Sequence, residues 1–250
     1  NITMQDFAFK MARNKPEKVK EGLHKRIRKS MGEDYDLAPF TPPYNPWDQR
    51  LCLVPDADLF TAIGNGSASV VTDRIDKVTA DSIVTSEGVS HPADVIIYAT
   101  GFHVTDGFDQ LKLKGARGDD LPTHWHQTGI NTHLGIATEG FPNLFFLLGP
   151  NTGLGHNSVV FMIEQQIKYI MKAIDAVASR GAQRIDVRPE IQEHFNKDIQ
   201  QKLAKGVWTK GGCTSWYLDS HGVNRTVWPG FTWQYWRATK DFEPADYEIA

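Results

Sequence analysis

The chain has 250 residues, 27 of them Lys or Arg and 30 Asp or Glu, which gives a formal net charge of −3. Hydrophobic residues make up 40% and charged residues 23%. These are the proportions of a soluble globular protein, so a disordered, collagen-like or coiled-coil chain is excluded. The longest apolar runs fall far short of the about 20 residues that a membrane helix needs, so no transmembrane segment is predicted.

The cysteine count and the first residue indicate where the chain comes from. Cys52 and Cys213 are too few for a disulfide framework or a Cys-rich zinc site, so we expect a reducing compartment, the cytoplasm. The chain shows no secretory signal. It starts at Asn1 rather than Met, which favours a piece of a longer polypeptide.

Basic residues gather at the start of the chain. Residues 1–30 hold nine Lys and Arg against three Asp and Glu, leaving 18 basic and 27 acidic residues, a net −9, for the remainder. A basic stretch is one mark of a nucleic-acid-binding protein. This one has no aromatic interleaving and no nucleic-acid motif, and the whole chain is acidic. A solvated helix face is therefore favoured, and no nucleic-acid partner is expected.

The first part of the chain predicts helices, a stiff connector and short strands. Good helix formers over 4–31 predict a helix. Four prolines within 36–50 predict an extended connector. A short helix is expected over 56–63. Short β-like runs follow at Ala68–Thr72, Arg74–Thr79 and Ser82–Thr85.

The rest of the chain is expected to combine buried strands with two longer helices. VIIYAT (95–100) and LFFLL (144–148) suit strands buried on both faces, and 103–140 looks irregular. One helix is expected to run to about Ser179, and another to begin at Pro189 after a short strand over 183–187. The apolar positions at helical spacing are Val159, Ile163, Ile167, Ile170, Ile174 and Val177 on the first helix and Ile191, Phe195, Ile199 and Leu203 on the second.

The loop GPNTGLGHNS (149–158) is the strongest local motif. A strand, glycines and a helix start in that order point backbone N–H groups at a shared spot, which suits an anion or a dinucleotide. Ser158 replaces the third small residue of the G-x-G-x-x-G fingerprint, and no acidic residue follows a second strand, so this is not a Rossmann fingerprint. A glycine-rich turn with no ligand stays open as the alternative.

Histidines and one cysteine invite other chemistry. His124-Trp125-His126 has a ligand-like spacing for a strand, but nothing nearby supplies a third ligand, so no metal site is predicted. Cys213 and His221 lack the local signature of a thiol nucleophile. Arg50 lies between the proline-rich connector and the apolar LCLVP. It is therefore a possible anion clamp, with an ordinary surface charge as the alternative.

Three longer motifs resemble the class B flavin-dependent monooxygenases, which include the Baeyer–Villiger monooxygenases. They are ATGF (99–102) after DVIIY, FPNLFFLLGPNTGLGHNSVVFMIE (141–164) and GGCTSWY…WPGFTWQYWR (211–237). YNPWDQRLCLVPDADLF (44–60) is similar to a subgroup of bacterial ketone and thio-compound monooxygenases. The resemblance runs from about residue 36 to the end of the chain.

The resemblance implies an α/β fold, the C-terminal half of a flavoprotein with two dinucleotide-binding domains, one for FAD and one for NADP. Residues 1–98 would be the C-terminal part of the NADP-binding domain with the preceding helix and the Pro-rich connector. Residues 99–250 would be the C-terminal part of the FAD-binding domain with its closing helices and aromatic-rich tail. Both glycine fingerprints of the family lie in the missing N-terminal half, so the fragment alone is expected to be inactive.

The resemblance also implies site residues. The family's Lys-Arg pair matches Gln49-Arg50, with Arg50 as the catalytic residue. The lysine that would meet the 2′-phosphate of NADPH is Gln49 here, so preference for NADPH over NADH is in doubt. The loop after the buried strand would approach the flavin ring, and Trp216 the nicotinamide. The cofactor-binding residues so implied are Gln49, Thr100, Gly101, Asn151, Gly155, His156, Asn157, Ser158 and Trp216.

The implied chemistry belongs to the cofactors. NADPH reduces FAD, O2 adds to the reduced flavin, and the peroxide so formed inserts oxygen into a ketone or oxidises a sulfide or amine. The implied partners are an organic substrate, O2 and the missing N-terminal half, and a homodimer stays open. The alternative is an inactive remnant that binds a nucleotide or a partner chain. A flavin disulfide reductase would need a closely spaced cysteine pair, which the sequence lacks.

Overall fold

The computed structural model of the chain describes residues 2–49, 51–52, 54–101, 105–155, 157–204, 206–210, 217–219 and 221–250. Side chains 2–7, 55, 105–107, 208 and 210 lie outside this description. The chain divides into two compact units, residues 1–101 and residues 102–250. Each unit is described by itself.

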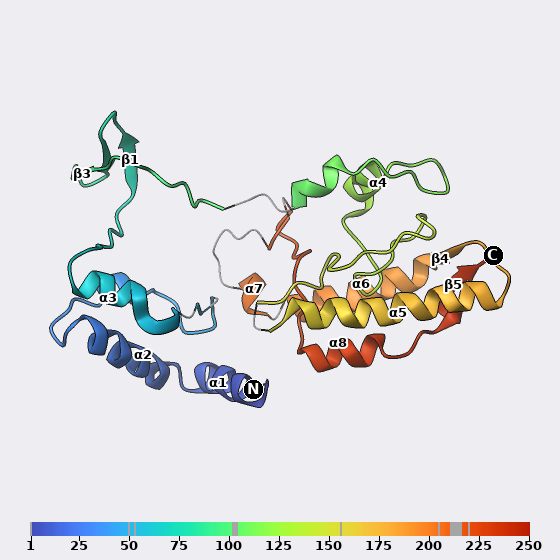
Figure 1. Cartoon of the computed structure of the whole chain (residues 1–250), viewed down its shortest axis with the longest axis horizontal. Helices are drawn as coiled ribbons and strands as arrows, with labels where there is room; N and C mark the ends of the chain where they lie inside the picture. The colour runs from blue at the N-terminus through green and yellow to red at the C-terminus, as the bar shows by residue number, and fades with distance from the viewer. Residues whose placement is uncertain are drawn as a thin grey trace. The chain divides into compact units, whose positions relative to one another are not determined.

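The first unit is built from short helices and one small sheet (Figure 1). Its helices are α1 (Ile2–Asn14), α2 (Pro16–Met31), η1 (Ala38–Phe40), η2 (Pro55–Ala57) and α3 (Asp58–Gly64). Its strands are β1 (Ile75–Val78), β2 (Ser82–Thr85) and β3 (Ser90–Pro92), which pair antiparallel in the order β1-β2-β3.

The single helix expected over 4–31 is two helices, and Pro16 is the reason. A proline lacks the N–H of a helical bond and keeps the residue before it out of the helical region. Lys15 accordingly has φ −139°, and Pro16 opens α2. Val19, Leu23 and Ile27 form the half-buried face of α2, which contacts α3. The basic side chains of the outer face are exposed, as expected of a solvated helix face.

Two of the three β-like runs are confirmed as strands, β1 and β2, joined by the turn at Ala80-Asp81. Ala68–Thr72 is not a strand, and the third strand β3 was not predicted. Asp73 anchors the turn after β2, since its carboxylate accepts bonds from the Ser86 hydroxyl at 2.6 Å and the Glu87 N–H at 2.9 Å. These bonds hold the pKa of Asp73 well below its usual range.

The prediction of a buried strand at VIIYAT (95–100) is wrong. The segment carries no assigned strand, and Val95, Ile97 and Tyr98 are 77%, 85% and 75% exposed. A strand needs a neighbouring ladder for its N–H and C=O groups. Among the described residues the strands are three or four residues long, and none pairs with this segment.

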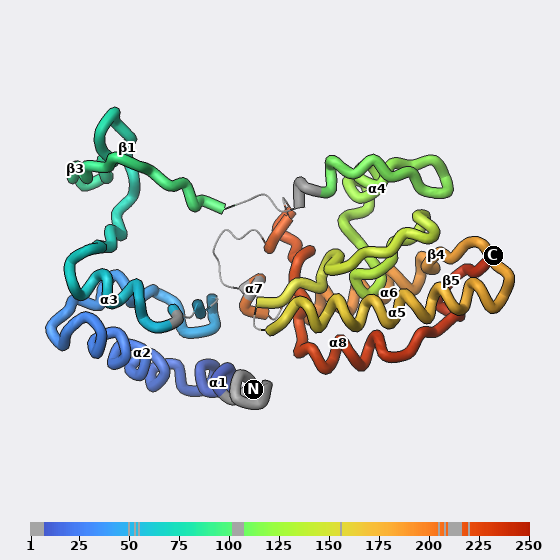
Figure 2. The backbone as a smooth tube through the Cα atoms, viewed as in Figure 1, coloured from blue at the N-terminus to red at the C-terminus, as the bar shows by residue number. Residues whose placement is uncertain are grey.

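The second unit is mainly helical (Figure 2). Its helices are η3 (Thr105–Gln110), α4 (Leu121–Thr128), α5 (Val159–Ser179), α6 (Pro189–Leu203), α7 (Val207–Lys210), α8 (Thr232–Thr239) and η4 (Pro244–Asp246). Strands β4 (Ile185–Val187) and β5 (Tyr247–Ile249) pair antiparallel. The expected helices ending near Ser179 and beginning at Pro189, and the strand between them, are confirmed by α5, α6 and β4.

Two expectations for this unit are wrong. Residues 103–140 are not wholly irregular, because they contain η3 and α4. LFFLL (144–148) is no buried strand either: it carries no assigned strand, and Leu147 and Leu148 are 51% and 41% exposed. The reason is again that the described residues contain no long strand beside which this segment could pair.

Helix α5 has the expected length, but the predicted stripe does not form its buried face. Its buried residues are Met162, Gln165, Gln166, Tyr169 and Ala173. Of the stripe, Ile170 and Val177 are half-buried and pack against the core around Tyr169, whereas Ile167 and Ile174 are 45% and 47% exposed. The apolar spacing predicted the helix, and packing within the unit decided which residues are buried.

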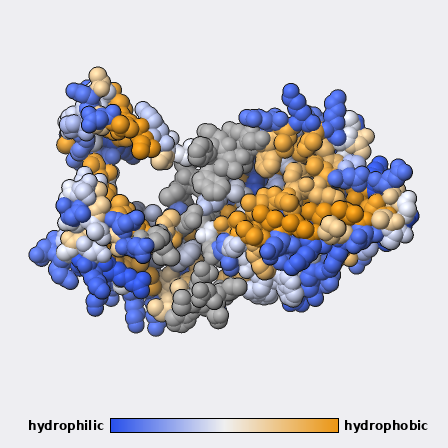
Figure 3. Space-filling view, in the orientation of Figure 1, coloured by the Kyte–Doolittle hydropathy of each residue, from blue (hydrophilic) through white to orange (hydrophobic). Residues whose placement is uncertain are grey.

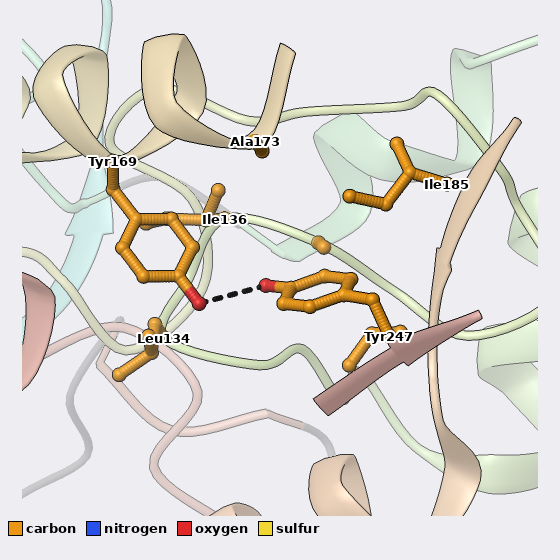
Figure 4. Close-up of a cluster of buried hydrophobic side chains, with 8 residues drawn as sticks. Leu134, Ile136, Tyr169, Ala173, Ile185 and Tyr247 are labelled. Atoms are coloured by element: carbon orange, nitrogen blue, oxygen red, sulfur yellow. Dashed lines mark hydrogen bonds between the residues drawn. The ribbon is translucent and has the colours of Figure 1, made fainter. Parts of the chain in front are cut away.

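The core of the second unit forms where α5 meets β4 and β5 (Figure 4). Tyr169 of α5 and Tyr247 of β5 are both 2% exposed, and their hydroxyls share a hydrogen bond of 3.1 Å. Leu134, Ile136 and Ile185 pack around them. Burial raises the pKa of both tyrosines, so they stay neutral at physiological pH.

No helix in the part of the chain that the structure describes is long and apolar enough to cross a membrane.

His133 makes the core of the second unit sensitive to pH. It is buried between Phe195 and Tyr247, with ring centroids 5.5 and 6.1 Å away. Burial lowers the pKa of His133 from 6.5 to about 4. The unfolded chain therefore binds this proton at higher pH than the folded chain does, and stability falls as the pH drops from about 6.5 towards 4.

We predict that His133→Phe removes this part of the pH dependence. The wild-type chain should lose on the order of 2–3 kcal/mol of unfolding free energy through His133 between pH 7 and pH 4.5. Urea unfolding at the two pH values measures the loss in the wild type and the variant. The exposed His126, changed to Gln, is the control and should keep the wild-type difference. An equal difference in His133→Phe would contradict the prediction.

Candidate functional site

The glycine loop 149–158 lies against residues 224–228, far away in sequence. The Gly153 N–H donates to the Thr226 carbonyl at 2.9 Å, and the Trp228 N–H donates to the Gly153 carbonyl at 2.9 Å. Gly153 has no room for a side chain, because an added Cβ would lie 2.9 Å from the Thr226 carbonyl oxygen. Gly153 of the predicted cofactor loop therefore allows the loop backbone to approach the backbone of residues 226–228 closely.

Asn151 ties the same two segments together from inside. It is 2% exposed, and its side-chain amide donates to the carbonyls of Asn224 at 2.9 Å and Val227 at 3.4 Å. Its backbone has φ 59°, a left-handed conformation that asparagine tolerates better than most residues. Since both amide donor bonds are made within the protein, Asn151 helps to position the loop.

The end of the loop leads into α5 without a side-chain cap. Ser158 is the N-cap residue of α5, is exposed, and makes no capping hydrogen bond. Asn157 does not cap the helix either. Its amide donates to the Thr232 hydroxyl at 3.4 Å, and its side-chain oxygen accepts from the Ser158 N–H. The first N–H groups of a 21-residue helix thus lack a capping side chain. Such an end attracts negative charge.

In the first unit, Gln49 closes a tight turn that is fixed to α1. Asp48 accepts from the Arg13 guanidinium at 2.9 Å and from the Asn45 N–H at 3.2 Å. Trp47 packs edge-on against Phe9 of α1, with ring centroids 5.6 Å apart. Gln49 is half-buried and faces Pro46 across an isolated bridge. These contacts fix the turn that Gln49 closes to α1.

The remaining predicted site residues are scattered. Thr100 and Gly101 are exposed at the end of the first unit, and Gly155 is half-buried in the glycine loop. Arg50, His156 and Trp216 lie outside the described residues. Within the second unit, the structure brings the predicted loop residues Asn151, Gly155, Asn157 and Ser158 together.

Sequence reasoning missed Asn224, the partner of Asn151. It is 1% exposed, its carbonyl accepts from Asn151 and Gln200, and its side-chain oxygen accepts from the N–H groups of Thr226 and Val227. A polar residue in an aromatic-rich, turn-rich tail gave no signal of this role. Only the approach of the two segments reveals it.

The histidine pair is on a helix, not on the strand expected for it. His124 and His126 belong to α4, where residues two apart point in different directions. His124 is buried and lies 3.7 Å from Glu139, while His126 is exposed and lies 3.0 Å from Asp109. No cluster of three metal-ligating side chains occurs among the described residues.

A cavity of about 480 Å³ lies in the second unit beside α4. Arg225 and Asp219 are part of its wall, together with Trp125 and His126. Arg225 is already neutralised by Asp219 at 3.3 Å and bound to the Asn131 side chain at 2.7 Å, so it offers no unpaired cation. None of the described site residues predicted from sequence lines this cavity.

The comparisons with known proteins agree with one another. No family model matches the chain. A Baeyer-Villiger monooxygenase of Pseudomonas aeruginosa is 40% identical over 229 residues, which is 91% of this chain and 42% of that protein. A Baeyer-Villiger monooxygenase of Streptomyces coelicolor is 35% identical over 215 residues, 85% of this chain and 40% of that protein.

Solved structures show the same fold. A cyclohexanone monooxygenase from Rhodococcus sp. Phi1 bound to NADP+ has a TM-score of 0.74 at 22% identity, covering 96% of this chain and 46% of that one. An oxidised steroid monooxygenase bound to NADP has a TM-score of 0.76 at 23% identity, covering 94% and 45%.

By sequence and by fold, the chain is a relative of the flavin-dependent monooxygenases of the Baeyer–Villiger class. It corresponds to less than half of such a protein, since it spans about 40% of the length of the two curated relatives. The mixed helix and sheet architecture expected from the sequence is confirmed as part of that flavoprotein fold.

We predict that Asn151→Ala destabilises the second unit by on the order of 2–3 kcal/mol. The change removes the amide donor from the Val227 carbonyl and one of two donors from the Asn224 carbonyl, and it puts alanine into a left-handed backbone. Urea unfolding measures the loss. Asn157→Ala is the matched control: it removes one long bond at 3.4 Å and an exposed bond from the Ser158 N–H, and it should cost less than about 1 kcal/mol. Equal losses in the two variants would contradict the role of Asn151.

Proposed function

We propose that the chain is the C-terminal part of an FAD- and NADPH-dependent monooxygenase that transfers one oxygen atom from O2 to an organic substrate. The observation that carries this is the 40% identity to a Baeyer-Villiger monooxygenase over 91% of the chain. The substrate class is a ketone, which would give an ester or lactone. Sulfur or nitrogen centres are a second substrate class on the same chemistry.

The glycine loop suits the ring end of a flavin better than a pyrophosphate. The N–H groups at the start of α5 lack a side-chain cap, and a helix N-terminus stabilises negative charge near it. Gly155, His156, Asn157 and Ser158 lie at this end of the loop. The G-x-G-x-x-G fingerprint that would hold a pyrophosphate is absent from the sequence, so that anchor belongs to the upstream part of the protein.

Bound FAD supplies the oxygen-transfer chemistry, and the residues of this chain bind, orient and exclude water. Arg50 holds the nicotinamide cofactor and keeps a fixed positive charge beside the reacting atoms. Gln49 precedes it in the sequence, and Trp216 would contact the nicotinamide of the bound cofactor. Thr100 and Gly101 form the crossing between the NADP-binding part, 1–98, and the FAD-binding part, 99–250. A cytoplasmic location stays a prediction from the cysteine count.

The alternative is an inactive remnant that binds a partner chain without turnover. The missing fingerprints favour it, because the 250 residues contain neither glycine motif of the family. Product analysis of the protein assembled with its N-terminal part separates the two proposals, since only the monooxygenase turns a ketone into an ester.

In the assembled enzyme, we predict that Arg50→Ala still permits NADPH oxidation but lowers ester formation by about a hundred- to a thousandfold. Removing one donor that stabilises charge in a dry site costs about 3–4 kcal/mol. Arg50→Lys should also form little ester, because an ammonium group lacks the planar fork of donors that a guanidinium offers. The measurement is ester formed per NADPH consumed.

Arg28→Ala is the control for Arg50→Ala. Arg28 is an exposed arginine of α2, and its loss should leave the yield of ester unchanged. A normal yield in Arg50→Ala would remove Arg50 from the catalytic role.

A second prediction for the assembled enzyme concerns the start of α5. Ser158→Asp should lower the reduction potential of the flavin, because a negative charge there disfavours the more negative reduced form. Ser179→Asp, the same change at the other end of α5, is the control and should leave the potential unchanged. Redox titration measures both. If Ser158→Asp only stabilises the fold as an ordinary N-cap and the potential stays the same, the helix does not point at the flavin ring.

A further inference from the structure

Helix α2 carries a basic face on its outer side. Lys18, Lys25 and Lys29 are exposed and follow one another at seven and four residues, so they form one row along the helix. Arg26 and Arg28 are exposed on the two flanks of this row. Figure 3 shows a hydrophilic surface over the first unit where α2 lies in Figure 1. We call these five residues the α2 basic face.

Within the described residues, no acidic side chain pairs with the α2 basic face. The nearby ion pairs use other basic residues: Arg13 pairs with Asp48 at 2.9 Å, and Lys20 pairs with Glu17 at 3.0 Å. In the part of the chain that the structure describes, none of the five residues of the face takes part in an ion pair. Two acidic residues of α2 are exposed, Glu17 and Glu21, against the five basic ones. The outer side of α2 therefore keeps an excess of positive charge.

The stability of the helix explains only part of this charge. Arg28 and Lys29 lie in the last turn of α2, where a positive charge stabilises the C-terminal end of a helix. Lys18, Lys25 and Arg26 lie before that turn. Lys25 and Lys29 are four residues apart, and like charges at that spacing repel each other and destabilise a helix. An external negative charge would relieve this repulsion.

The composition of the α2 basic face indicates the class of partner. The exposed residues of α2 include no aromatic or aliphatic side chain. The core of a protein–protein interface is enriched in aromatic residues and depleted in Lys, so a folded protein is a poor match. Proteins that bind single-stranded nucleic acid stack its bases on aromatic side chains, which this face lacks. An anionic lipid surface requires only that several positive charges are presented together, since each Lys or Arg adds to the attraction.

We propose that the α2 basic face docks the protein onto a membrane surface that contains anionic phospholipids. The row from Lys18 to Lys29 is about 16 Å long, so its charges meet several headgroup phosphates of one surface at once. Binding is electrostatic and reversible, because the apolar row of Val19, Leu23 and Ile27 faces α3 and is not available for insertion. The site residues of the proposed monooxygenase take no part, so the docking is independent of turnover.

The test measures the fraction of the 250-residue chain that sediments with lipid vesicles. Vesicles of phosphatidylcholine and phosphatidylglycerol in equal parts are anionic, and vesicles of phosphatidylcholine alone are the neutral control. We expect binding to the anionic vesicles at low salt and none to the neutral ones. Raising the ionic strength to about 0.15 M shortens the Debye length to about 8 Å, so the binding should weaken.

The triple variant Lys18→Gln, Lys25→Gln and Lys29→Gln removes the row of charges. It should weaken binding to the anionic vesicles at low salt by on the order of a hundredfold, because each lysine near the surface adds to the attraction. Glutamine forms helices about as well as lysine does, so α2 should stay folded, which circular dichroism checks. Arginine at the same three positions keeps the charges and should keep the binding.

The matched control is a second triple variant, Lys112→Gln, Lys168→Gln and Lys197→Gln, which has the same net charge as the first. These three lysines are exposed in the second unit and form no ion pair among the described residues. The control should bind the anionic vesicles as the wild type does.

Four results would overturn the proposal. The first is a wild-type chain that does not bind the anionic vesicles at low salt, and the second is equal binding by the two triple Gln variants. The third is binding that salt does not weaken or that the Arg variant loses, since the contact would then not be electrostatic. The fourth is release of the bound chain by duplex DNA at an equal phosphate concentration, which would make a nucleic acid the preferred partner. None of these results bears on ester formation, so the proposed function is tested separately.

Discussion

The attachment of the glycine loop to the segment around Asn224 is the interaction on which the second unit depends. Asn151 spends both amide donors on carbonyls of that segment, and Gly153 allows the two backbones to approach. This fixes where α5 begins and in which direction its N-terminus points. The core around Tyr169 then follows from the position of the helix.

The predicted site residues differ in how the protein holds them. The amide group of Asn151 donates two hydrogen bonds within the protein. Ser158 is exposed at a helix start that has no side-chain cap. In the first unit, Arg13 and Phe9 hold the turn that precedes Gln49 and Arg50. The support of each part of the site thus comes from its own unit.

The exposed apolar segments share one physical cause, which is that the described residues offer them nothing to pack against. VIIYAT (95–100) and LFFLL (144–148) have the composition of buried strands, and α5 has the composition of a helix covered on two sides. A backbone can satisfy its hydrogen bonds in a sheet only beside another strand, and a helix can bury a second face only against another layer. The short antiparallel strands among the described residues provide neither. The chain spans less than half the length of the two curated relatives.

The sequence by itself determined the helices whose signals are local: α5 and α6 from their spacing and from Pro189, and the β1–β2 hairpin from its turn. It also determined the similarity to Baeyer-Villiger monooxygenases, because the motifs are long and ordered. Tertiary structure alone decided which face of α5 is buried, since apolar residues lie on two faces and only packing chooses between them. It also decided that Asn151 pairs with Asn224, and that His124 and His126 lie on a helix. These depend on contacts between residues far apart in the chain, which local patterns do not encode.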